Sequence, residues 1–499
     1  MNIQEAKEEI AHTLRAYLQK GEDGEYLFPA ARQRPILLMG PPGIGKTAIM
    51  EQVAAECGVG LVAYTMTHHT RQSAVGLPKI VEKTYSGVPV TVTEYTMSEI
   101  IASVYDAMES SGNREGILFL DEINCVSETL APTMLQFLQN KTFGSHRLPE
   151  GWVVVAAGNP PEFNKSVRDF DVVTLDRVRQ INVEANLPVW LDYAREKQLH
   201  GAVISYLTVK PDRFYTVERK NGALSFVTAR GWEDLSRILQ SYETLNVPIS
   251  EALAAQYLHR EETARDFAAY YRLYRKYGTD YGISELLDGV LTVEGFREKA
   301  AMAAGGGFDE RVSVVNLLLE GLQARLRAYG ELDARAVGLH GVLRRFRGLS
   351  QPLPDFLAAN EKALNVKRDN KLISREDARR ETWILGRLRQ MEAVIREQRI
   401  HDPEEVFACM KEQFRLDLSQ REESVSAVGK AMENAFRFVL GSFGQGQELT
   451  LLVTCLTKMP DAQGYLRLHG SEAYLPYADV LLYHRREEAL RRACEEFLS

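Results

Sequence analysis

The chain has 499 residues, of which 45% are hydrophobic and 26% are charged, and its formal net charge is −8. A chain of this length is too long for a single hydrophobic core, so we expect two or three domains. The acidic balance gives no general attraction to nucleic acid or anionic lipid, and no apolar run of the sequence approaches the roughly 20 residues that cross a bilayer. A charged, helical N-terminus without a signal-peptide pattern and five scattered cysteines without a CxxC pair indicate a cytoplasmic protein.

The first expected element is an amphipathic helix at the N-terminus. Its apolar face should pack on the rest of the domain, and it is formed by Ile3, Ile10, Leu14, Tyr17 and Leu18.

A strand, a glycine-rich loop and a helix follow between residues 34 and 52. The loop fits the pattern G-x-x-x-x-G-K-[ST] at every fixed position, and it is formed by Gly40, Pro41, Pro42, Gly43, Ile44, Gly45, Lys46 and Thr47. Backbone N–H groups of such a loop converge on phosphate oxygens, and the positive end of the new helix points to the same place. We expect Lys46 to neutralise the β- and γ-phosphates and the Thr47 hydroxyl to bind Mg²⁺. The loop therefore predicts a nucleoside triphosphate site.

Two apolar strands carry the next candidate residues. Residues 66–93 read as a long irregular segment, and helical periodicity returns at 98–110. The strand at 116–120 then ends in Asp121 and Glu122. Ligands bind at the carboxyl ends of strands in open α/β sheets, so we expect Asp121 to hold the Mg²⁺ site and Glu122 to polarise the attacking water. The alternative is a strand followed by an acidic helix cap, which the complete loop upstream disfavours.

Asn159 ends the next apolar strand, residues 152–157, and precedes two prolines. An amide at this strand tip can reach the γ-phosphate or the attacking water. The alternative is a structural turn.

With these segments in order, the chain resembles the AAA+ ATPases and, within them, the MoxR family. The residues that carry the resemblance are GPPGIGKT (40–47), ILFLDEIN (117–124), LPEGWVVVAAGNPPE (148–162), LDR (175–177) and Thr228-Ala229-Arg230. The first two motifs are shared by many ATPases, whereas the third, with LDR after it, points to MoxR proteins. The resemblance ends near Tyr277.

The resemblance implies roles for further residues. Asn159 resembles sensor 1, and Arg230 resembles the sensor 2 arginine of the helical lid. The loop and hairpin between Met66 and Thr93 resemble the helix-2 insert of this clade, which faces the pore of a ring.

The resemblance also implies an arginine finger that completes the site of a neighbouring subunit. Arg177 resembles this finger. Related proteins usually carry an aromatic residue next, where this chain has Val178. Arg179 is therefore a competing candidate, and Arg168 is a weaker one.

We expect an α/β P-loop NTPase fold of the AAA+ αβα type with a helical lid, followed by a mostly α-helical C-terminal region. The expected boundaries are 1–187 for the nucleotide-binding core, 188–277 for the lid and 278–499 for the C-terminal domain. Breaks in the helical pattern of that domain fall at 305–307 and 350–354. No motif indicates what the C-terminal domain does.

The resemblance implies an ATPase with ATP and Mg²⁺ as cofactors, acting as a chaperone-like remodeller or an assembly factor. It implies a homo-oligomeric ring, hexameric in the family, and a protein partner such as one with a von Willebrand factor A domain. Two alternatives stay open. One is a nucleic-acid motor, which the acidic balance and the lack of a recognisable binding module disfavour. The other is a scaffold in which hydrolysis only times assembly.

Overall fold

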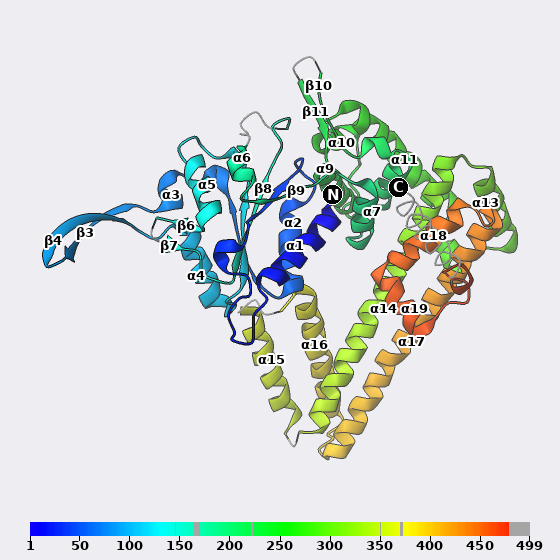
Figure 1. Ribbon diagram of the computed structural model, residues 1–499. Coiled ribbons are helices and arrows are strands. Elements are labelled where there is room, and N and C mark those ends of the chain that lie inside the picture. Colours follow the sequence, from blue (N-terminus) through cyan, green and yellow to red (C-terminus); the bar gives the residue numbers. More distant parts are fainter. Residues whose placement is uncertain (145, 164–169, 221–222, 350, 370–372, 479–499) are drawn as a thin grey trace. The chain divides into compact units, whose positions relative to one another are not determined.

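The structure is a computed structural model that describes residues 1–144, 146–163, 170–220, 223–349, 351–369 and 373–478 (Figure 1). The chain divides into two compact units. Met1–Val203 and Lys210–Ala268 form the first unit, and Ile204–Val209 and the chain from Ala269 onward form the second. Among the described residues, none of the helices combines the length and the apolar character needed to span a membrane.

A parallel five-stranded sheet is the centre of the first unit, with the strand order β2-β5-β8-β1-β9. Its strands are β1 (Ile36–Met39), β2 (Gly60–Thr65), β5 (Gly116–Asp121), β8 (Trp152–Gly158) and β9 (Arg179–Asn182). The interior strands β5 and β8 are almost wholly buried, which explains their continuous apolar sequence. Leu120 of β5 lies opposite Ala156 of β8. The ends of these two strands therefore reach the same edge of the sheet.

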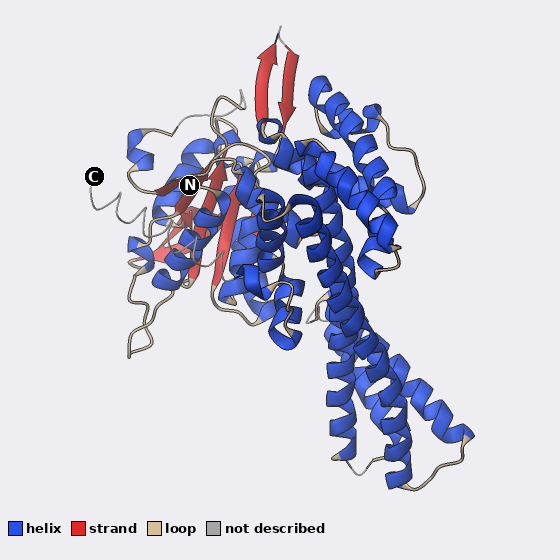
Figure 2. Cartoon of the chain, turned by 90° about the vertical axis from the view of Figure 1, so that its right-hand side faces the viewer, coloured by secondary structure: helices blue, strands red, loops and turns tan. Residues whose placement is uncertain are grey.

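Helices cover both faces of this sheet, as Figure 2 shows. Successive strand residues point to opposite faces. Leu38 packs in one core with α1 (Ile3–Tyr17) and α2 (Lys46–Cys57), whereas Leu37 packs in another with α4 (Glu99–Ser111) and α5 (Ala131–Asn140). The expected apolar face of the N-terminal helix lies in the first of these cores, as predicted. The α/β fold with helices on both faces is confirmed.

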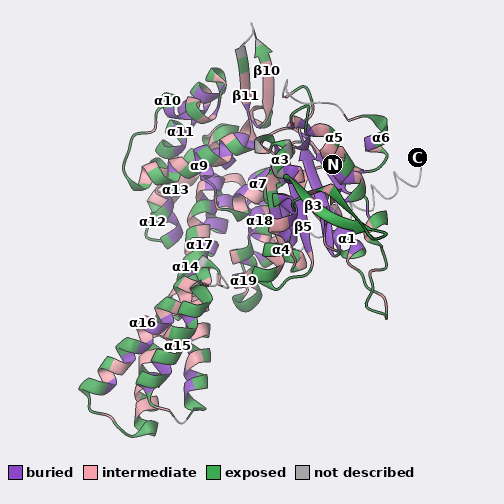
Figure 3. Cartoon of the chain, turned by 90° about the vertical axis from the view of Figure 1, so that its left-hand side faces the viewer, coloured by how far each residue is buried: buried purple, intermediate pink, exposed green. Residues whose placement is uncertain are grey.

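The segment expected to be irregular is largely structured. It contains a 3-10 turn η2 (Met66–His68), a short helix α3 (Arg71–Val75) and the antiparallel hairpin of β3 (Pro78–Tyr85) and β4 (Val88–Tyr95). The expectation of an irregular segment, which rested on turn signals, was wrong, whereas the hairpin that the resemblance implied is present between Pro78 and Tyr95. Figure 3 shows this hairpin as mostly exposed.

The remaining elements of the first unit include two further antiparallel hairpins. These elements are η1 (Ala30–Arg32), η3 (Ile123–Cys125), β6 (Thr142–Phe143), β7 (His146–Arg147), α6 (Val172–Leu175), α7 (Leu187–Glu196), η4 (Pro211–Arg213), β10 (Thr216–Lys220), β11 (Ala223–Val227), α9 (Ala229–Thr244) and α10 (Glu251–Tyr257). The hairpins are formed by β6 with β7 and by β10 with β11, and the sequence pattern did not predict the latter. The helix α9 begins at Ala229, with Thr228 as its N-cap. Phe226 lies in β11, which pairs with β10.

Two helices contribute residues to both units. They are α8 (Gly201–Val209) and α11 (Glu261–Tyr281), so the expected boundary at Tyr277 falls inside a helix.

Helices are the only regular secondary structure among the described residues of the second unit. It contains α12 (Ile283–Asp288), α13 (Val293–Gly305), α14 (Phe308–Arg347), α15 (Leu353–Asp369), α16 (Arg375–Glu397), α17 (Pro403–Phe443), α18 (Gln447–Lys458) and α19 (Pro460–His469). The long helices α14 and α17 take part in two separate hydrophobic clusters, one shared with α18 and α19 and the other with α15 and α16. The mostly helical C-terminal region is confirmed. At the first predicted break, α13 ends at Gly305 and α14 begins at Phe308, and at the second, α15 begins at Leu353; residue 350 lies outside the described residues.

Candidate active site

The glycine-rich loop joins β1 to α2 with the backbone shape that a phosphate site requires. Gly43 and Gly45 have φ angles of 73° and 98°, a left-handed conformation that residues with a Cβ rarely adopt. Lys46 follows immediately as the first residue of α2. The loop therefore ends at a helix N-terminus, where backbone N–H groups and the helix dipole favour a phosphate.

Lys46 is buried beneath this loop, with only 8% of its surface exposed. Its Nζ donates to the carbonyl oxygens of Gly40 at 2.6 Å and Pro41 at 2.9 Å, and to Oδ1 of Asn159 at 2.8 Å. The pKa of Lys46 is lowered to about 8, chiefly by burial. The carboxylates of Asp121 and Glu122 oppose this shift, and the positive charge of Arg230 adds to it. All three hydrogen-bond acceptors are neutral oxygens. A polyphosphate beside Lys46 would therefore stabilise its charged form strongly.

The hydroxyl of Thr47 donates a hydrogen bond of 2.7 Å to Oδ2 of Asp121. This bond joins the first turn of α2 to the end of β5. A hydroxyl and a carboxylate oxygen so close together suit Mg²⁺, which prefers oxygen ligands and usually completes its shell with water and substrate phosphates. In the described part of the chain, no three His, Cys, Asp or Glu side chains form a metal cluster by themselves.

Glu122 adopts a left-handed backbone conformation, with φ of 56°. Its N–H donates to Oδ1 of Asp121 at 2.9 Å, and its Oε2 accepts a 3.0 Å hydrogen bond from the hydroxyl of Thr67. A non-glycine residue held in this conformation has a strained backbone. This left-handed conformation changes the direction of the chain as it leaves β5.

Asn159 follows β8, and the side chain of Asn124 holds its backbone. Nδ2 of Asn124 donates to the carbonyl oxygen of Asn159 at 2.8 Å, and Oδ1 of Asn124 accepts from the Asn159 N–H at 3.3 Å. Gly158 leaves room for this approach, since a Cβ there would lie 2.7 Å from Oδ1 of Asn124. The Asn159 side chain is then free to reach Lys46.

The helical segment after the sheet contacts the glycine-rich loop directly. The backbone N–H of Arg230 donates to the carbonyl oxygen of Gly43 at 3.1 Å, and the hydroxyl of Tyr215 donates to the carbonyl oxygen of Pro42 at 2.8 Å. The Arg230 side chain is exposed, and its charge acts on Lys46.

The structure thus gathers most of the predicted residues at one edge of the sheet. Hydrogen bonds or charge interactions connect Lys46, Thr47, Asp121, Glu122, Asn159 and Arg230.

Arg177 does not join this group, since none of the interactions described for the loop residues involves it. It is exposed after the short helix α6. Arg179 instead donates to the hydroxyl of Thr13 and forms an ion pair with Glu9 of α1. Arg168 lies outside the described residues.

Sequence reasoning missed three residues of this site. Asn124 stands inside the motif that contains the two acids, so its place in the motif could have drawn attention to it. Thr67 and Tyr215 lie in segments without a motif, and only the folded chain brings them to Glu122 and to the loop.

A known protein family matches the part of the chain that contains this site. Residues 36–175 match the family model described as "ATPase family associated with various cellular activities (AAA)". Among solved structures, a mutant of Thermotoga maritima RuvB matches with a TM-score of 0.30 and 12% sequence identity, over 52% of this chain and 69% of that chain. In the search of curated proteins, nothing matches. The family match spans the loop, both acids and Asn159, so this part of the first unit is similar to AAA ATPase domains.

Proposed function

We propose that this chain is an ATP-hydrolysing AAA+ ATPase of the MoxR type, which works as a ring and remodels or assembles a partner protein. The observation that carries the proposal is the hydrogen bond between Thr47 and Asp121. It joins the phosphate-binding loop to the acids of β5, in the arrangement that ATP hydrolysis requires.

Each residue of the group has a role in this proposal. Lys46 and the N–H groups of the loop bind the β- and γ-phosphates. Thr47 and Asp121 would hold Mg²⁺, which neutralises phosphate charge when it is bound. Glu122 orients a water molecule for attack and takes its proton. Asn159 and Arg230 contact the γ-phosphate or the water.

The proposed ring follows from the position of Arg177. Its exposed side chain is available to a neighbouring copy, whereas Arg179 is engaged by α1 of its own chain. These contacts favour Arg177 over Arg179 as the arginine finger. A finger that acts in a neighbouring subunit makes a single chain an incomplete enzyme. The resemblance to MoxR proteins suggests six subunits and a β3–β4 hairpin at the pore.

The helical second unit is our candidate for partner recognition. An ATPase needs the α/β core and its lid, whereas α14 and α17 extend over 40 and 41 residues and build hydrophobic clusters of their own. By resemblance, a protein with a von Willebrand factor A domain is a candidate partner.

Affinity capture with the Glu122→Gln chain tests the proposal. This variant should bind ATP without hydrolysing it and so hold its partner. The control is Lys46→Ala, which should capture less because it binds ATP poorly. A protein whose capture depends on ATP, and which the wild-type chain alters during turnover, supports remodelling. A gel shift at low salt with no ATP-dependent protein partner would favour the nucleic-acid motor instead. A partner that is held but never altered would favour the scaffold.

A further inference from the structure

Two consecutive carbonyl groups of the phosphate-binding loop accept hydrogen bonds from the lid. Pro42 O accepts from the hydroxyl of Tyr215 at 2.8 Å, and Gly43 O accepts from the N–H of Arg230 at 3.1 Å. In a trans peptide unit, the C=O and the following N–H point in opposite directions. A carbonyl held toward the lid therefore turns the N–H of the next residue away from the lid. The N–H groups affected are those of Gly43 and Ile44.

These two N–H groups lie in the part of the loop that is expected to surround phosphate oxygens. We infer that Tyr215 is a positioning residue for nucleotide binding. Its hydroxyl fixes the peptide unit that presents the Gly43 N–H, while the backbone of Arg230 fixes the next one. The inference rests on the proposed ATP-binding function and deepens it.

The two donors lie near the two ends of the β10–β11 hairpin, with Arg230 in the first turn of α9, three residues after Val227 at the end of β11. Tyr215 directly precedes β10, and Thr228 directly follows β11. The pairing of Thr216 with Val227 places Tyr215 and Thr228 side by side. After β11, the Thr228 side chain packs so closely on the loop that a Cβ at Gly43 would lie 3.1 Å from it. The residues that flank the two ends of this hairpin therefore contact the loop at two adjacent peptide units.

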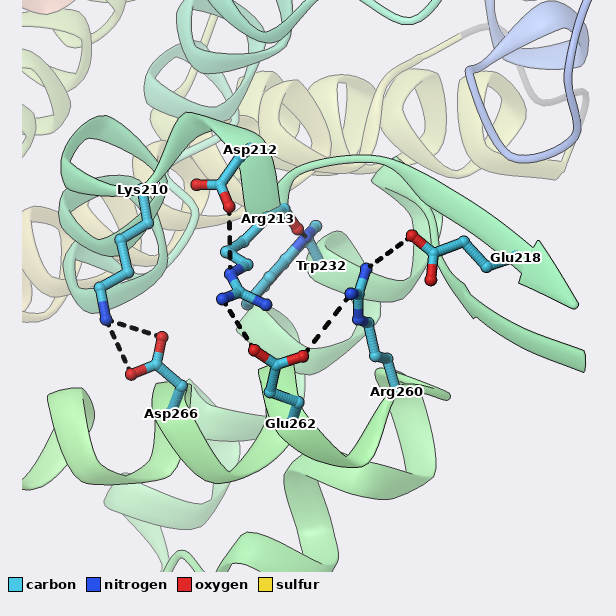
Figure 4. A network of polar contacts seen from close by, with 8 residues as sticks. All are labelled: Lys210, Asp212, Arg213, Glu218, Trp232, Arg260, Glu262 and Asp266. Carbon is cyan, nitrogen blue, oxygen red and sulfur yellow. Dashed lines mark hydrogen bonds and ion pairs between the residues drawn. The ribbon is translucent and has the colours of Figure 1, made fainter. Parts of the chain in front are cut away.

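A polar network fixes the chain on both sides of Tyr215 (Figure 4). The indole N–H of the fully buried Trp232 donates to the carbonyl oxygens of Arg213 at 3.3 Å and Phe214 at 3.1 Å. The Arg213 side chain in turn pairs with Glu262 of α11 at 3.0 Å. These contacts hold the residues that precede Tyr215.

The network continues to the strand that follows Tyr215. Glu262 also pairs with Arg260 at 3.6 Å, and Arg260 pairs with Glu218 of β10 at 3.5 Å. Tyr215 thus lies between two anchored segments, so little conformational freedom remains to be lost when its hydroxyl binds the loop. Burial raises the pKa of Tyr215, which keeps the phenol protonated and able to donate.

The test compares Tyr215→Phe with Tyr193→Phe in the full-length chain. Both variants keep the aromatic ring and lose one hydroxyl. Tyr193 is a matched control, because it is also half-buried in the first unit and its hydroxyl donates to Glu233 rather than to the loop. The measurements are the KM for MgATP, kcat and the unfolding temperature without nucleotide.

We expect Tyr215→Phe to raise the KM for ATP about 3- to 10-fold, as loss of one neutral hydrogen bond allows, with kcat within about twofold of wild type. Tyr193→Phe should leave the KM unchanged, and both variants should unfold at similar temperatures. A wild-type KM in Tyr215→Phe, or the same increase in Tyr193→Phe, would overturn the inference while leaving the ATPase proposal intact. Failure of the wild-type chain to bind ATP at all would instead overturn the proposed function, and this inference with it.

Discussion

The hydroxyl of Thr67 donates a hydrogen bond of 3.0 Å to Oε2 of Glu122. Thr67 lies in η2, directly after β2, and Glu122 lies directly after β5, the neighbouring strand of the sheet. A donor at this carboxylate competes with the water molecule that Glu122 is proposed to polarise. Thr67 thus occupies a hydrogen-bonding position on the Glu122 carboxylate that the attacking water would otherwise use.

Replacing Thr67 with valine removes this donor at nearly constant volume. We expect basal kcat to rise about threefold or more, because hydrogen bonds to charged groups are among the stronger ones, and the KM for ATP to stay unchanged. Steady-state ATPase assays check this, with Thr67→Ser as the control that keeps the hydroxyl. A fall in kcat would mean that Thr67 supports the productive position of Glu122.

Arg177 and Arg179 should differ in what they lose on substitution by alanine. Arg177→Ala should lose almost all turnover, since an arginine finger is worth about 10³–10⁵ in rate in related phosphoryl-transfer enzymes. Rings mixed from Arg177→Ala and Lys46→Ala subunits should regain some activity, because some of their interfaces combine an intact site with an intact finger.

Arg179→Ala should mainly affect stability. Its contacts with Glu9 and Thr13 anchor α1, and a partly exposed ion pair of this kind is worth about 0.2–1 kcal/mol in the free energy of unfolding. Urea unfolding measures this loss. Absence of rescue in demonstrably mixed rings, or loss of turnover on Arg179→Ala, would indicate that Arg179 is the arginine finger.

Nucleotide binding should depend on pH through Lys46. Its pKa is lowered to about 8 by burial, and bound phosphates raise it because they stabilise the ammonium. Above pH 8, binding must therefore take up a proton, so ATP affinity should fall as the pH rises, by up to about tenfold per pH unit. Equilibrium binding between about pH 7 and about pH 9.5 checks this. The Lys46→Arg chain should lose the pH dependence, since guanidinium does not titrate in this range. Constant affinity in the wild-type chain would contradict the assignment of Lys46.

Part of the second unit can be removed without cutting its larger core. Asp333 of α14 and Arg421 of α17 form an ion pair at 2.6 Å, which shows that the two helices lie side by side there. We call residues 336–418 the distal arm. They contain a separate hydrophobic cluster formed by α15, α16 and the adjoining parts of α14 and α17. Joining residues 335 and 419 by a short glycine-rich loop should keep the larger cluster, ATP binding and hydrolysis.

We expect this arm-deleted chain to lose its partner in affinity capture. Capture at full strength would assign recognition to another part of the chain. A chain that ends near Tyr277 is a poorer test. Tyr270 forms 2.7 Å hydrogen bonds with the buried hydroxyls of Ser205 and Ser313, and Ser313 belongs to α14. Such a truncation would therefore expose part of a buried core.

The sequence predicted the parts of the site that lie within single motifs. The loop up to Thr47 and the acids after β5 each follow from a local pattern of strand, turn and helix, and Asn159 follows from its place at a strand end. Contacts between distant segments could not be predicted in this way. Tyr215 and Pro42 are separated by 173 positions, and only the folded lid brings the tyrosine hydroxyl to the loop.

Two features of the fold also escaped prediction, for physical reasons. The strands of the β10–β11 hairpin are five residues each, and β10 carries a single apolar residue, Val217, so the hairpin lacks the long apolar runs that identified the central sheet. The lid boundary was drawn where the resemblance ended, whereas Ser205 and Tyr270 join α8 and α11 to the second unit through buried hydroxyl contacts. The boundary between two units depends on which residues pack in the same core, and sequence similarity does not show this packing.

ATP hydrolysis by the Glu122→Gln chain, with ATP binding measured on the same protein, tests the central claim most directly. The substitution keeps the shape of the side chain and removes the carboxylate that is proposed to take the proton of the attacking water. We predict that Glu122→Gln binds ATP about as tightly as the wild-type chain and turns it over at least about 10²-fold more slowly, as expected for loss of a general base. Near-normal turnover by Glu122→Gln would contradict the account.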